Sequence, residues 1–566
     1  MGYERGDESM SAASAEAAST SSKGVLGFIE KAGNKVPHPV MMFVYLIIFV
    51  IILSAVLDLL DVGVTEEVIV PAPIVVEEQW VGGSTRPVEG IVPDYAEREY
   101  EIIEQRVNVR SLLTVSGIRH IFTSFVSNFA SFSVVAVILV AMIGVGVAEE
   151  AGLMAALIRK LVAVAPARAL TFIIVFVGGI SSVATDAGYL ILIPLGAAAF
   201  LSVGRHPIAG IAAAYAGVSV FFAVNILIAP VDAMIVEMTN EAIAIVNPGE
   251  TISITSNLYF SIVSTFLMTF VVTFVTERMV EPRLGKYNPE VALAGGDDGA
   301  TAPAIDPTAG VDAAVEAKGL RYALYGIIGM IAFYTLLTAP PGAPLRDPET
   351  DKIIGNTPFM DSLIFMITML FLVAGICYGI GAKTIKSSTE VIAAVTKTFA
   401  SLSGLIFMLL VISQFIAFFN YSNIPTVIAG GMANLLESAD INEILLLVAL
   451  IFVIMLIDFI IPGVMPKWAI FAPVFVPLFI RLGVAPQTVL SAYRIGDSPV
   501  NVITPLMVYL PFIVIVAQRY QKSAGIGTVV AMMMPYTLIV AISWTLIFVL
   551  WYILGIPLGP GYPVDI

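Results

Sequence analysis

The sequence predicts an all-α integral membrane protein with about nine transmembrane helices plus two opposed re-entrant hairpins, arranged as an inverted repeat. Three observations predict this fold class: an apolar composition, a series of apolar runs long enough to span a bilayer, and helix breaks that recur at a fixed offset. Of the 566 residues, 58% are hydrophobic and only 13% are charged. Soluble domains carry about 25% charged residues, so most side chains here must face something other than water.

The composition also excludes several functions. The chain has one cysteine, Cys377, and three histidines, so it offers neither an intrachain disulfide nor a Cys/His zinc motif. We therefore expect no cofactor and no metal site, with Na⁺ as the one ion left open. The formal net charge of −15 argues against nucleic acid as a partner, because phosphate binding requires clustered Lys and Arg.

The apolar runs define the predicted spans. Residues 1–36, which are rich in Ser and Ala, are predicted to form a disordered cytoplasmic tail. A span needs about 20 apolar residues to cross the lipid bilayer. Such runs occur near residues 40–60, 133–148, 207–230, 258–277, 320–338, 360–381, 399–420, 486–518 (interrupted) and 528–555.

Two long polar segments lie between the spans. Residues 61–110 are predicted to be an acidic outer loop, in which 68–70 and 74–76 could form short strands. Residues 284–319, rich in Gly, Ala and Pro, are predicted to be a cytoplasmic linker. This linker separates two transmembrane halves, 37–283 and 320–566.

Two further segments, 168–204 and 444–483, are predicted to be re-entrant hairpins. In each, two apolar arms too short to cross a bilayer flank a break, at 181–186 in the first and at 461–466 in the second. Irregular backbone persists at membrane depth only where protein or water satisfies its polar groups. The hairpin tips are therefore predicted to lie inside the protein.

The helix breaks recur at an offset of 279 residues. At this offset, residues of the first hairpin region fall on residues of the same type in the second: Pro194 on Pro473, Gly204 on Gly483, Pro207 on Pro486, Gly217 on Gly496 and Ser219 on Ser498. Five predicted spans separate the two hairpins, and because this number is odd, the second copy is predicted to be inverted. Inverted repeats with broken helices are typical of secondary transporters, which bind substrate between the repeats.

The loop charges predict the orientation. Lys and Arg gather in the loops that this topology places inside, whereas the outer connection 231–257 has neither. The positive-inside rule then predicts a cytoplasmic N-terminus and a periplasmic C-terminus in a bacterial inner membrane.

Arg494 and Asp497 are the strongest candidate site residues. They lie three residues apart, just before Pro499, in an otherwise apolar span. Arg494 could offer its planar guanidinium to a substrate carboxylate, and Asp497 could accept a proton or help to hold Na⁺. Alternatively, the two form a structural ion pair that holds the break together.

Other polar residues at the breaks are candidates with alternatives of their own. Asp186 could bind a cation or proton, or cap the following helix. Trp468 could stack on an aromatic substrate or anchor the hairpin tip. Asn225 and Asn501 could offer amide oxygens to a cation, or hydrogen-bond between helices, and Asp458 is a weaker candidate of the same kind. The group Asp232, Glu237 and Glu241 is interpreted as a solvated outer loop.

Several segments together resemble the p-aminobenzoyl-glutamate transporter (AbgT) family. They are IFTSFVSNF at 121–129, GVGVAEEAGL at 144–153, DAGY at 186–189, KWAIFAP at 467–473 and YRIGDSPVNVITP at 493–505. The resemblance extends over nearly the whole chain after residue 24. It departs at the second hairpin tip, where residues 463–466 replace a serine-containing sequence and remove hydroxyl ligands.

The resemblance implies an inner-membrane homodimer with nine transmembrane helices and two opposed hairpins. It also implies uptake of p-aminobenzoyl-glutamate or efflux of sulfonamide antimetabolites, driven by an ion gradient. Family residues important for transport match Asp186, Trp468, Pro486, Arg494, Asp497 and Pro505.

The sequence therefore predicts an ion-coupled transporter of p-aminobenzoyl-glutamate-like or sulfonamide-like aromatic anions, with H⁺ or Na⁺ as the coupling ion. Arg494, Trp468, Asp497, Pro486, Pro505 and Asn501 are assigned to the substrate site. Asp186, Asp497, Asn225 and Asp458 are assigned to ion coupling. A sodium-coupled di- or tricarboxylate carrier of the same architecture is the alternative. A channel or an intramembrane hydrolase is less favoured, because no catalytic Ser/His or metal set lies within the spans.

Overall fold

The computed structural model describes residues 39–71, 80–81, 84–85, 100–181, 188–288, 312–353, 357–438, 442–459, 461, 463–504 and 507–566. The predicted tail 1–36 and most of the predicted linker lie outside these residues. Apart from two small antiparallel sheets, the described elements are helices, so the predicted helical fold class is confirmed.

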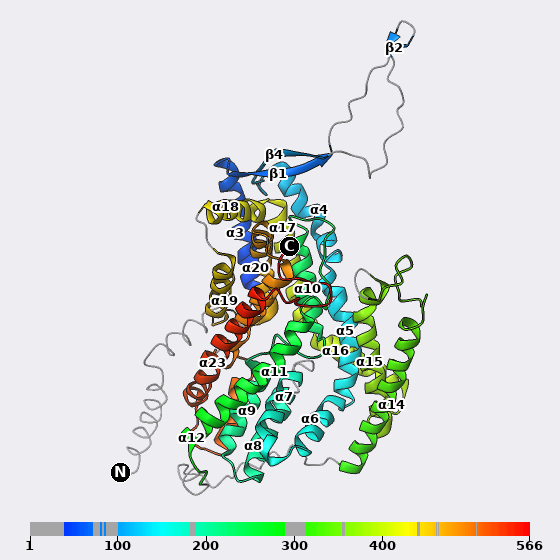
Figure 1. Ribbon diagram of the computed structural model, residues 1–566, viewed down its shortest axis with the longest axis vertical. Helices are drawn as coiled ribbons and strands as arrows, with labels where there is room; N and C mark the ends of the chain where they lie inside the picture. The colour runs from blue at the N-terminus through cyan, green and yellow to red at the C-terminus, as the bar shows by residue number, and fades with distance from the viewer. Residues whose placement is uncertain are drawn as a thin grey trace, which may run out of the picture.

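The helices run mostly along the long axis of the molecule (Figure 1). The ribbon formed by β1 (Gly63–Pro71) and β4 (Tyr100–Asn108) lies at one end, and α12 (Glu281–Leu284) lies at the other. β1 and β4 pair antiparallel, from Gly63 opposite Asn108 to Pro71 opposite Tyr100. The strand predicted at 68–70 is thus part of β1, whereas 74–76 lies outside the described residues. A second, smaller pair joins β2 (Trp80–Val81) to β3 (Ser84–Thr85).

The first half contains helices α3 to α12. Their bounds are α3 (Pro39–Leu59), α4 (Val115–Ala130), α5 (Ser133–Glu150), α6 (Leu153–Ala163), α7 (Leu170–Ser181), α8 (Ile193–Ser202), α9 (Pro207–Ser219), α10 (Pro230–Ile243), α11 (Leu258–Val275) and α12. Short π-helical turns precede α8, at η5 (Gly188–Leu192), and α12, at η6 (Thr276–Val280).

The second half contains helices α14 to α23. Their bounds are α14 (Ala313–Thr338), α15 (Pro358–Ala382), α16 (Ser388–Ser401), α17 (Ser403–Tyr421), α18 (Ile424–Ser438), α19 (Glu443–Asp458), α20 (Val464–Arg481), α21 (Pro486–Asp497), α22 (Leu510–Gln518) and α23 (Ile526–Ile553). A 3₁₀ turn, η7 (Pro499–Val502), follows α21.

Side-chain caps set where several helices begin. In each case the oxygen of the residue before the helix accepts a backbone N–H two or three residues further on, which satisfies one of the donors that a helix start leaves unpaired. These caps are Thr114 for α4, Thr357 for α15, Ser387 for α16 and Asn442 for α19.

Eight described helices are long and apolar enough to cross a membrane, or nine if the bent pair α6 and α7 forms one span. This number agrees with the prediction, but the members differ. The eight include α20, which was predicted to be a hairpin arm, and they omit two predicted spans, 207–230 and 486–518. The second of these consists of α21, η7 and α22, in agreement with the interruption predicted there. The single span 207–230 was wrong: the chain breaks after α9, and α10 begins at Pro230, where the Asp232 carboxylate accepts the Ala229 N–H at 2.7 Å.

The helix ends match at the 279-residue offset read from the sequence. α9 begins at Pro207 and α21 begins at Pro486, in both cases with proline in the first turn, where its missing N–H costs nothing. Each is preceded by a glycine with positive φ, +76° at Gly204 and +80° at Gly483, which ends the helix before it. The same backbone signals therefore terminate and restart helices in both halves.

Two matched glycines bring helices into close contact. A Cβ on Gly217 of α9 would lie 2.8 Å from the Val175 carbonyl oxygen of α7. A Cβ on Gly496 of α21 would lie 2.7 Å from the Ile454 Cβ of α19. Val175 and Ile454 are themselves 279 residues apart, so the two halves share a packing contact as well as helix ends.

We predict that Gly496→Ala destabilises the protein by about 1–3 kcal/mol, because the added methyl group overpacks the α19–α21 contact. The thermal unfolding midpoint of detergent-purified protein measures this loss. Gly404→Ala is the matched control, because a Cβ there meets nothing within 4 Å. Equal midpoints for the two variants would contradict the close packing of the matched glycines.

Candidate functional site

The candidate site lies where two helix breaks meet: the one between α9 and α10, at residues 220–229, and the one that follows α21. Ser498, at the end of α21, accepts the Ala223 N–H of the other break at 3.1 Å. The Ala223 carbonyl oxygen in turn accepts a hydrogen bond from Arg494 Nη1 at 2.7 Å. α21 ends at Asp497, and the 3₁₀ turn η7 begins two residues later at Pro499, which has no N–H to continue the helical hydrogen bonds. Broken helices from both halves are therefore fastened together at this point.

Arg494 forms an ion pair with Asp232. Its Nη1 lies 2.5 Å from Asp232 Oδ1, and the two side chains are 2% and 13% exposed. The Arg494 Nε–H has no acceptor among the described residues. The alternative of an Arg494–Asp497 pair is not what the structure has, and the interpretation of Asp232 as part of a solvated loop was wrong. Asp232 lies in the first turn of α10, whose inner face is buried.

A second set of charged side chains joins α19 and α20, the two arms of the predicted second hairpin, to α21. Lys467 on α20 donates to Asp458 at the end of α19, and its Nζ lies 2.6 Å from Asp497 Oδ1. All three side chains are buried, with exposures of at most 1%. The second carboxylate oxygens, Asp458 Oδ2 and Asp497 Oδ2, have no hydrogen-bond partner in the described structure. Lys467 thus holds two carboxylates apart, and each keeps one oxygen without a partner.

These five side chains, Arg494, Asp232, Lys467, Asp458 and Asp497, form what we call the buried charge cluster. It contains three carboxylates and two cations, so with every group ionised it carries one excess negative charge. Uncompensated charge inside a membrane protein is costly, and it marks sites that bind ions or protons. Within the described residues, no three His, Cys, Asp or Glu side chains are placed to hold a metal ion.

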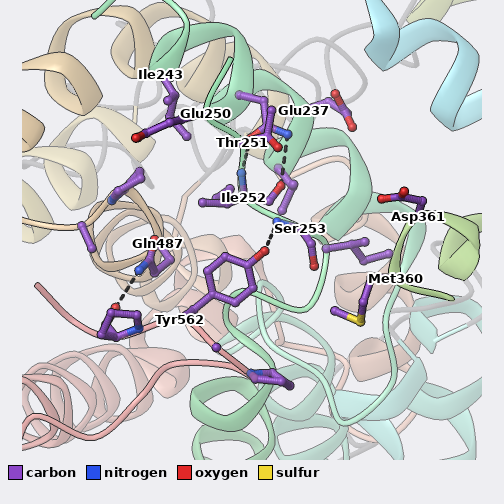
Figure 2. A pocket seen from close by; sticks show the side chains of 18 of the residues that line it. Glu237, Ile243, Glu250, Thr251, Ile252, Ser253, Met360, Asp361, Gln487 and Tyr562 are labelled. Atoms are coloured by element: carbon purple, nitrogen blue, oxygen red, sulfur yellow. Dashed lines mark hydrogen bonds between the residues drawn. The ribbon is translucent and has the colours of Figure 1, made fainter. Parts of the chain in front are cut away.

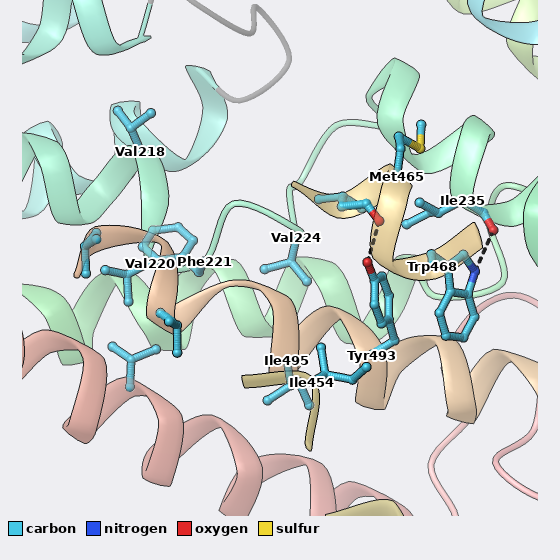
Figure 3. Close-up of a cluster of buried hydrophobic side chains, with 14 of the residues drawn as sticks. Val218, Val220, Phe221, Val224, Ile235, Ile454, Met465, Trp468, Tyr493 and Ile495 are labelled. Carbon is cyan, nitrogen blue, oxygen red and sulfur yellow. Dashed lines mark hydrogen bonds between the residues drawn. The ribbon is translucent and has the colours of Figure 1, made fainter. Parts of the chain in front are cut away.

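Trp468 directly follows Lys467 and is fully buried, and Figure 3 shows it next to Tyr493. Its ring stacks on Tyr493, with centroids 4.3 Å apart, and its Nε1–H donates to Thr239 Oγ1 at 2.9 Å. The Tyr493 hydroxyl donates to the Val464 carbonyl oxygen at the start of α20. In this conformation Tyr493 covers one face of the indole, so Trp468 joins α20 to α10 and α21.

The other predicted site residues have mixed placements. The Asn225 amide donates to the Gly179 carbonyl oxygen at 3.1 Å, which joins the break between α9 and α10 to the end of α7. Asn501 donates to the Asp497 carbonyl oxygen at 3.0 Å. Pro486 lies at the start of α21, on the wall of a large cavity. Asp186 and Pro505 lie outside the described residues, so their predicted roles stay predictions.

That cavity, of about 800 Å³, is lined in part by the C-terminal residues Asp565 and Ile566; Figure 2 draws side chains of its lining. We call it the acidic vestibule, because its lining includes Glu237, Glu250, Asp361 and Asp565 but neither Lys nor Arg. Its wall is formed in part by α10 and by the start of α21, the helices that carry Asp232 and Arg494. At 1.5 Å per residue, Arg494 lies about 12 Å along the helix from Pro486.

Neither Asp232 nor Lys467 was assigned to the site from the sequence. The signal for Asp232 was local: Pro230 two residues earlier marks a helix start, where an acidic side chain caps the first turn. Lys467 could have been recognised from its position, because it follows the second hairpin tip, which was predicted to lie inside the protein. A lysine there needs a carboxylate partner.

The protein has many apolar helices, and two helix breaks, one in each half, are joined at a buried charge cluster. These features define a polytopic membrane transporter. Residues 24–566 match the family described as "AbgT putative transporter family". The chain belongs to this family. It is 32% identical to the p-aminobenzoyl-glutamate transport protein of Escherichia coli K12 over 557 residues, 98% of this chain and 99% of that protein.

Two solved structures are similar along nearly their whole length. The Alcanivorax borkumensis YdaH transporter superposes with a TM-score of 0.78 at 35% identity, covering 93% of this chain and 100% of that one. Neisseria gonorrhoeae MtrF, described within a class of antimetabolite efflux pumps, superposes with a TM-score of 0.81 at 34% identity, covering 95% and 100%. These relatives are transporters, so the chain is a transporter and not an enzyme.

We predict that Lys467→Met lowers stability by about 3–5 kcal/mol, because it leaves two buried carboxylates without their shared cation. The double variant Lys467→Met/Asp458→Asn should recover much of this loss, since it restores a single excess negative charge. Thermal unfolding of the purified variants measures both effects. A double variant no more stable than Lys467→Met would contradict the charge-balance account.

Proposed function

We propose that this chain is a proton-coupled antiporter that exports p-aminobenzoyl-glutamate-like or sulfonamide-like aromatic anions across the inner membrane. The observation that carries this proposal is the excess negative charge of the buried charge cluster at the joined helix breaks. A proton or a cation is needed there to neutralise it. Its binding and release can then be linked to the movement of the two halves around the site.

The chemistry of the cluster suits an aromatic anion. Arg494 keeps an Nε–H without an acceptor, and a guanidinium binds carboxylate or sulfonyl oxygens in its plane. Trp468 and Tyr493 place two aromatic rings next to it, stacked on each other and buried in this conformation. The names of two relatives, a p-aminobenzoyl-glutamate transport protein and an antimetabolite efflux pump, point to the same substrate class.

H⁺ is favoured over Na⁺ as the coupling ion. The position between Asp458 and Asp497, where a sodium ion would gain two carboxylate ligands, is taken by the Lys467 ammonium group. A proton needs no such space, because it can bind one of the carboxylate oxygens that have no partner. The Lys467 ammonium at this position also disfavours the sodium-coupled di- or tricarboxylate carrier.

The acidic vestibule favours export of the anion. On the predicted orientation it opens to the periplasm, where its carboxylates attract cations and oppose the re-entry of anionic substrate. Protons entering there would be exchanged for substrate leaving from inside. The bacterial inner membrane, the cytoplasmic N-terminus and the homodimer implied by the family resemblance are parts of the same proposal.

We predict that proteoliposomes accumulate labelled p-aminobenzoyl-glutamate in response to an imposed pH step and not to an imposed Na⁺ gradient. Arg494→Ala, Asp497→Asn and Asp232→Asn should each reduce the initial rate at least about tenfold, since removing one partner of a buried charge pair costs about 3–5 kcal/mol and about 1.4 kcal/mol already corresponds to a factor of ten. Arg321→Ala, at an exposed position on α14, is the matched control and should transport as the wild type does.

Each other outcome has a definite meaning. Normal transport by both Arg494→Ala and Asp497→Asn would contradict the site. A response to Na⁺ alone, together with competition by di- or tricarboxylates, would support the alternative carrier. Flux that does not saturate and shows no exchange would indicate a channel.

A further inference from the structure

A second cavity, of about 510 Å³, lies among α6, the end of α8 and the start of α14. Its wall is mostly apolar, with Leu170, Leu195 and Leu320 among its residues, and its rim carries Arg159 and Lys160. Cavities of about 300–1,000 Å³ are of the size that holds small ligands. No member of the buried charge cluster lines it, so this cavity is separate from the proposed transport site.

The rim of this cavity has one uncompensated positive charge. Arg159 Nε donates to Glu316 Oε1 at 2.9 Å, and the two side chains are only 16% and 15% exposed, so their charges cancel. Lys160, the next residue, is exposed and forms no ion pair with any side chain that the structure describes. An anionic group at the rim would therefore meet Lys160 alone.

One side of the cavity is formed by α14, an apolar helix that is mostly exposed. α14 has a long apolar sequence, but only 6% of its most apolar window is buried inside the protein. The cavity lies at the α12 end of the molecule, opposite the β1–β4 ribbon (Figure 1). Basic residues gather at this end, including Arg205, Arg283 and Lys286, and the positive-inside rule places them at the cytoplasmic leaflet, where anionic lipids are enriched.

We propose that this cavity binds an anionic phospholipid, with an acyl chain against its apolar wall and the headgroup phosphate at Lys160. A soluble anion would gain one exposed lysine and leave the apolar wall unused. A zwitterionic lipid would fill the wall but bring no net charge to the rim. An anionic amphiphile matches both parts of the cavity, and basic pockets between transmembrane helices on the cytoplasmic side bind such lipids.

The test titrates delipidated full-length protein with phosphatidylglycerol or phosphatidylcholine of identical acyl chains, and counts bound lipids by native mass spectrometry. The wild type should prefer phosphatidylglycerol. Lys160→Gln should lower the affinity for phosphatidylglycerol about fivefold, the weight of one lysine near a charged membrane surface, and leave phosphatidylcholine unchanged. Ala317→Trp, which adds a ring at an exposed lining position, should weaken both lipids.

Lys318→Gln is the matched control. Lys318 lies at the same end of the molecule, with its ammonium 5.5 Å from the centre of the Tyr322 ring and outside the cavity lining. The proposal is overturned if Lys160→Gln binds phosphatidylglycerol as the wild type does, or if Lys318→Gln weakens it equally. It is also overturned if inorganic phosphate displaces the lipid, because the headgroup alone would then account for binding. The binding of phosphatidylglycerol and of phosphatidylcholine is measured without the transported substrate, so the result does not depend on the proposed function.

Discussion

The structure depends on pairing charges that a membrane interior would otherwise exclude. Moving a charged side chain out of water costs several kcal/mol, and this cost is offset only where partners and further hydrogen bonds are in place. Arg494 meets this requirement through Asp232, and Lys467 through Asp458 and Asp497. Because these partners lie on α10, α19, α20 and α21, the same contacts that neutralise charge also join the two halves of the chain.

Helix breaks make this arrangement possible. A continuous helix satisfies its own backbone and offers only side chains to its neighbours, whereas a break exposes N–H and C=O groups that must find partners. Ala223 illustrates the point, because its N–H bonds to Ser498, just after α21, and its carbonyl oxygen bonds to Arg494 of α21. The glycines at 204 and 483 and the prolines at 207 and 486 set where helices end and restart, and so where polar groups can gather.

The two halves share a backbone plan and differ in chemistry. Tyr189 and Trp468 occupy matched positions, as do Tyr215 and Arg494. In the first half these side chains are neutral, and the Tyr189 hydroxyl accepts a hydrogen bond from Ser219 at 2.9 Å. In the second half the matched positions adjoin Lys467 and Asp497. Charge is thus concentrated in the second half, with Asp232 as the contribution from the first.

The sequence was informative about the fold because local signals carry it. Proline and glycine identified the helix ends at Gly204 and Gly483, the helix starts at Pro207 and Pro486, and the break that follows Asp497. The pairing within the site could not be predicted in the same way, because Arg494 and Asp232 are 262 residues apart and no local pattern joins them. The helix from Pro230 was missed because apolar residues before the break suggested one continuous span. Tyr493 was not recognised as the stacking partner of Trp468, since the contact depends on how α20 meets α21.

The central claim is that the excess negative charge of the buried charge cluster is neutralised by a proton whose binding is linked to substrate. Calorimetric titration of purified protein with p-aminobenzoyl-glutamate, in two buffers of different ionisation enthalpy, tests this most directly. The account predicts a binding enthalpy that differs between the buffers, because protons are exchanged, and a difference that disappears in Asp497→Asn. The same enthalpy in both buffers for the wild type, with saturable binding, would contradict it.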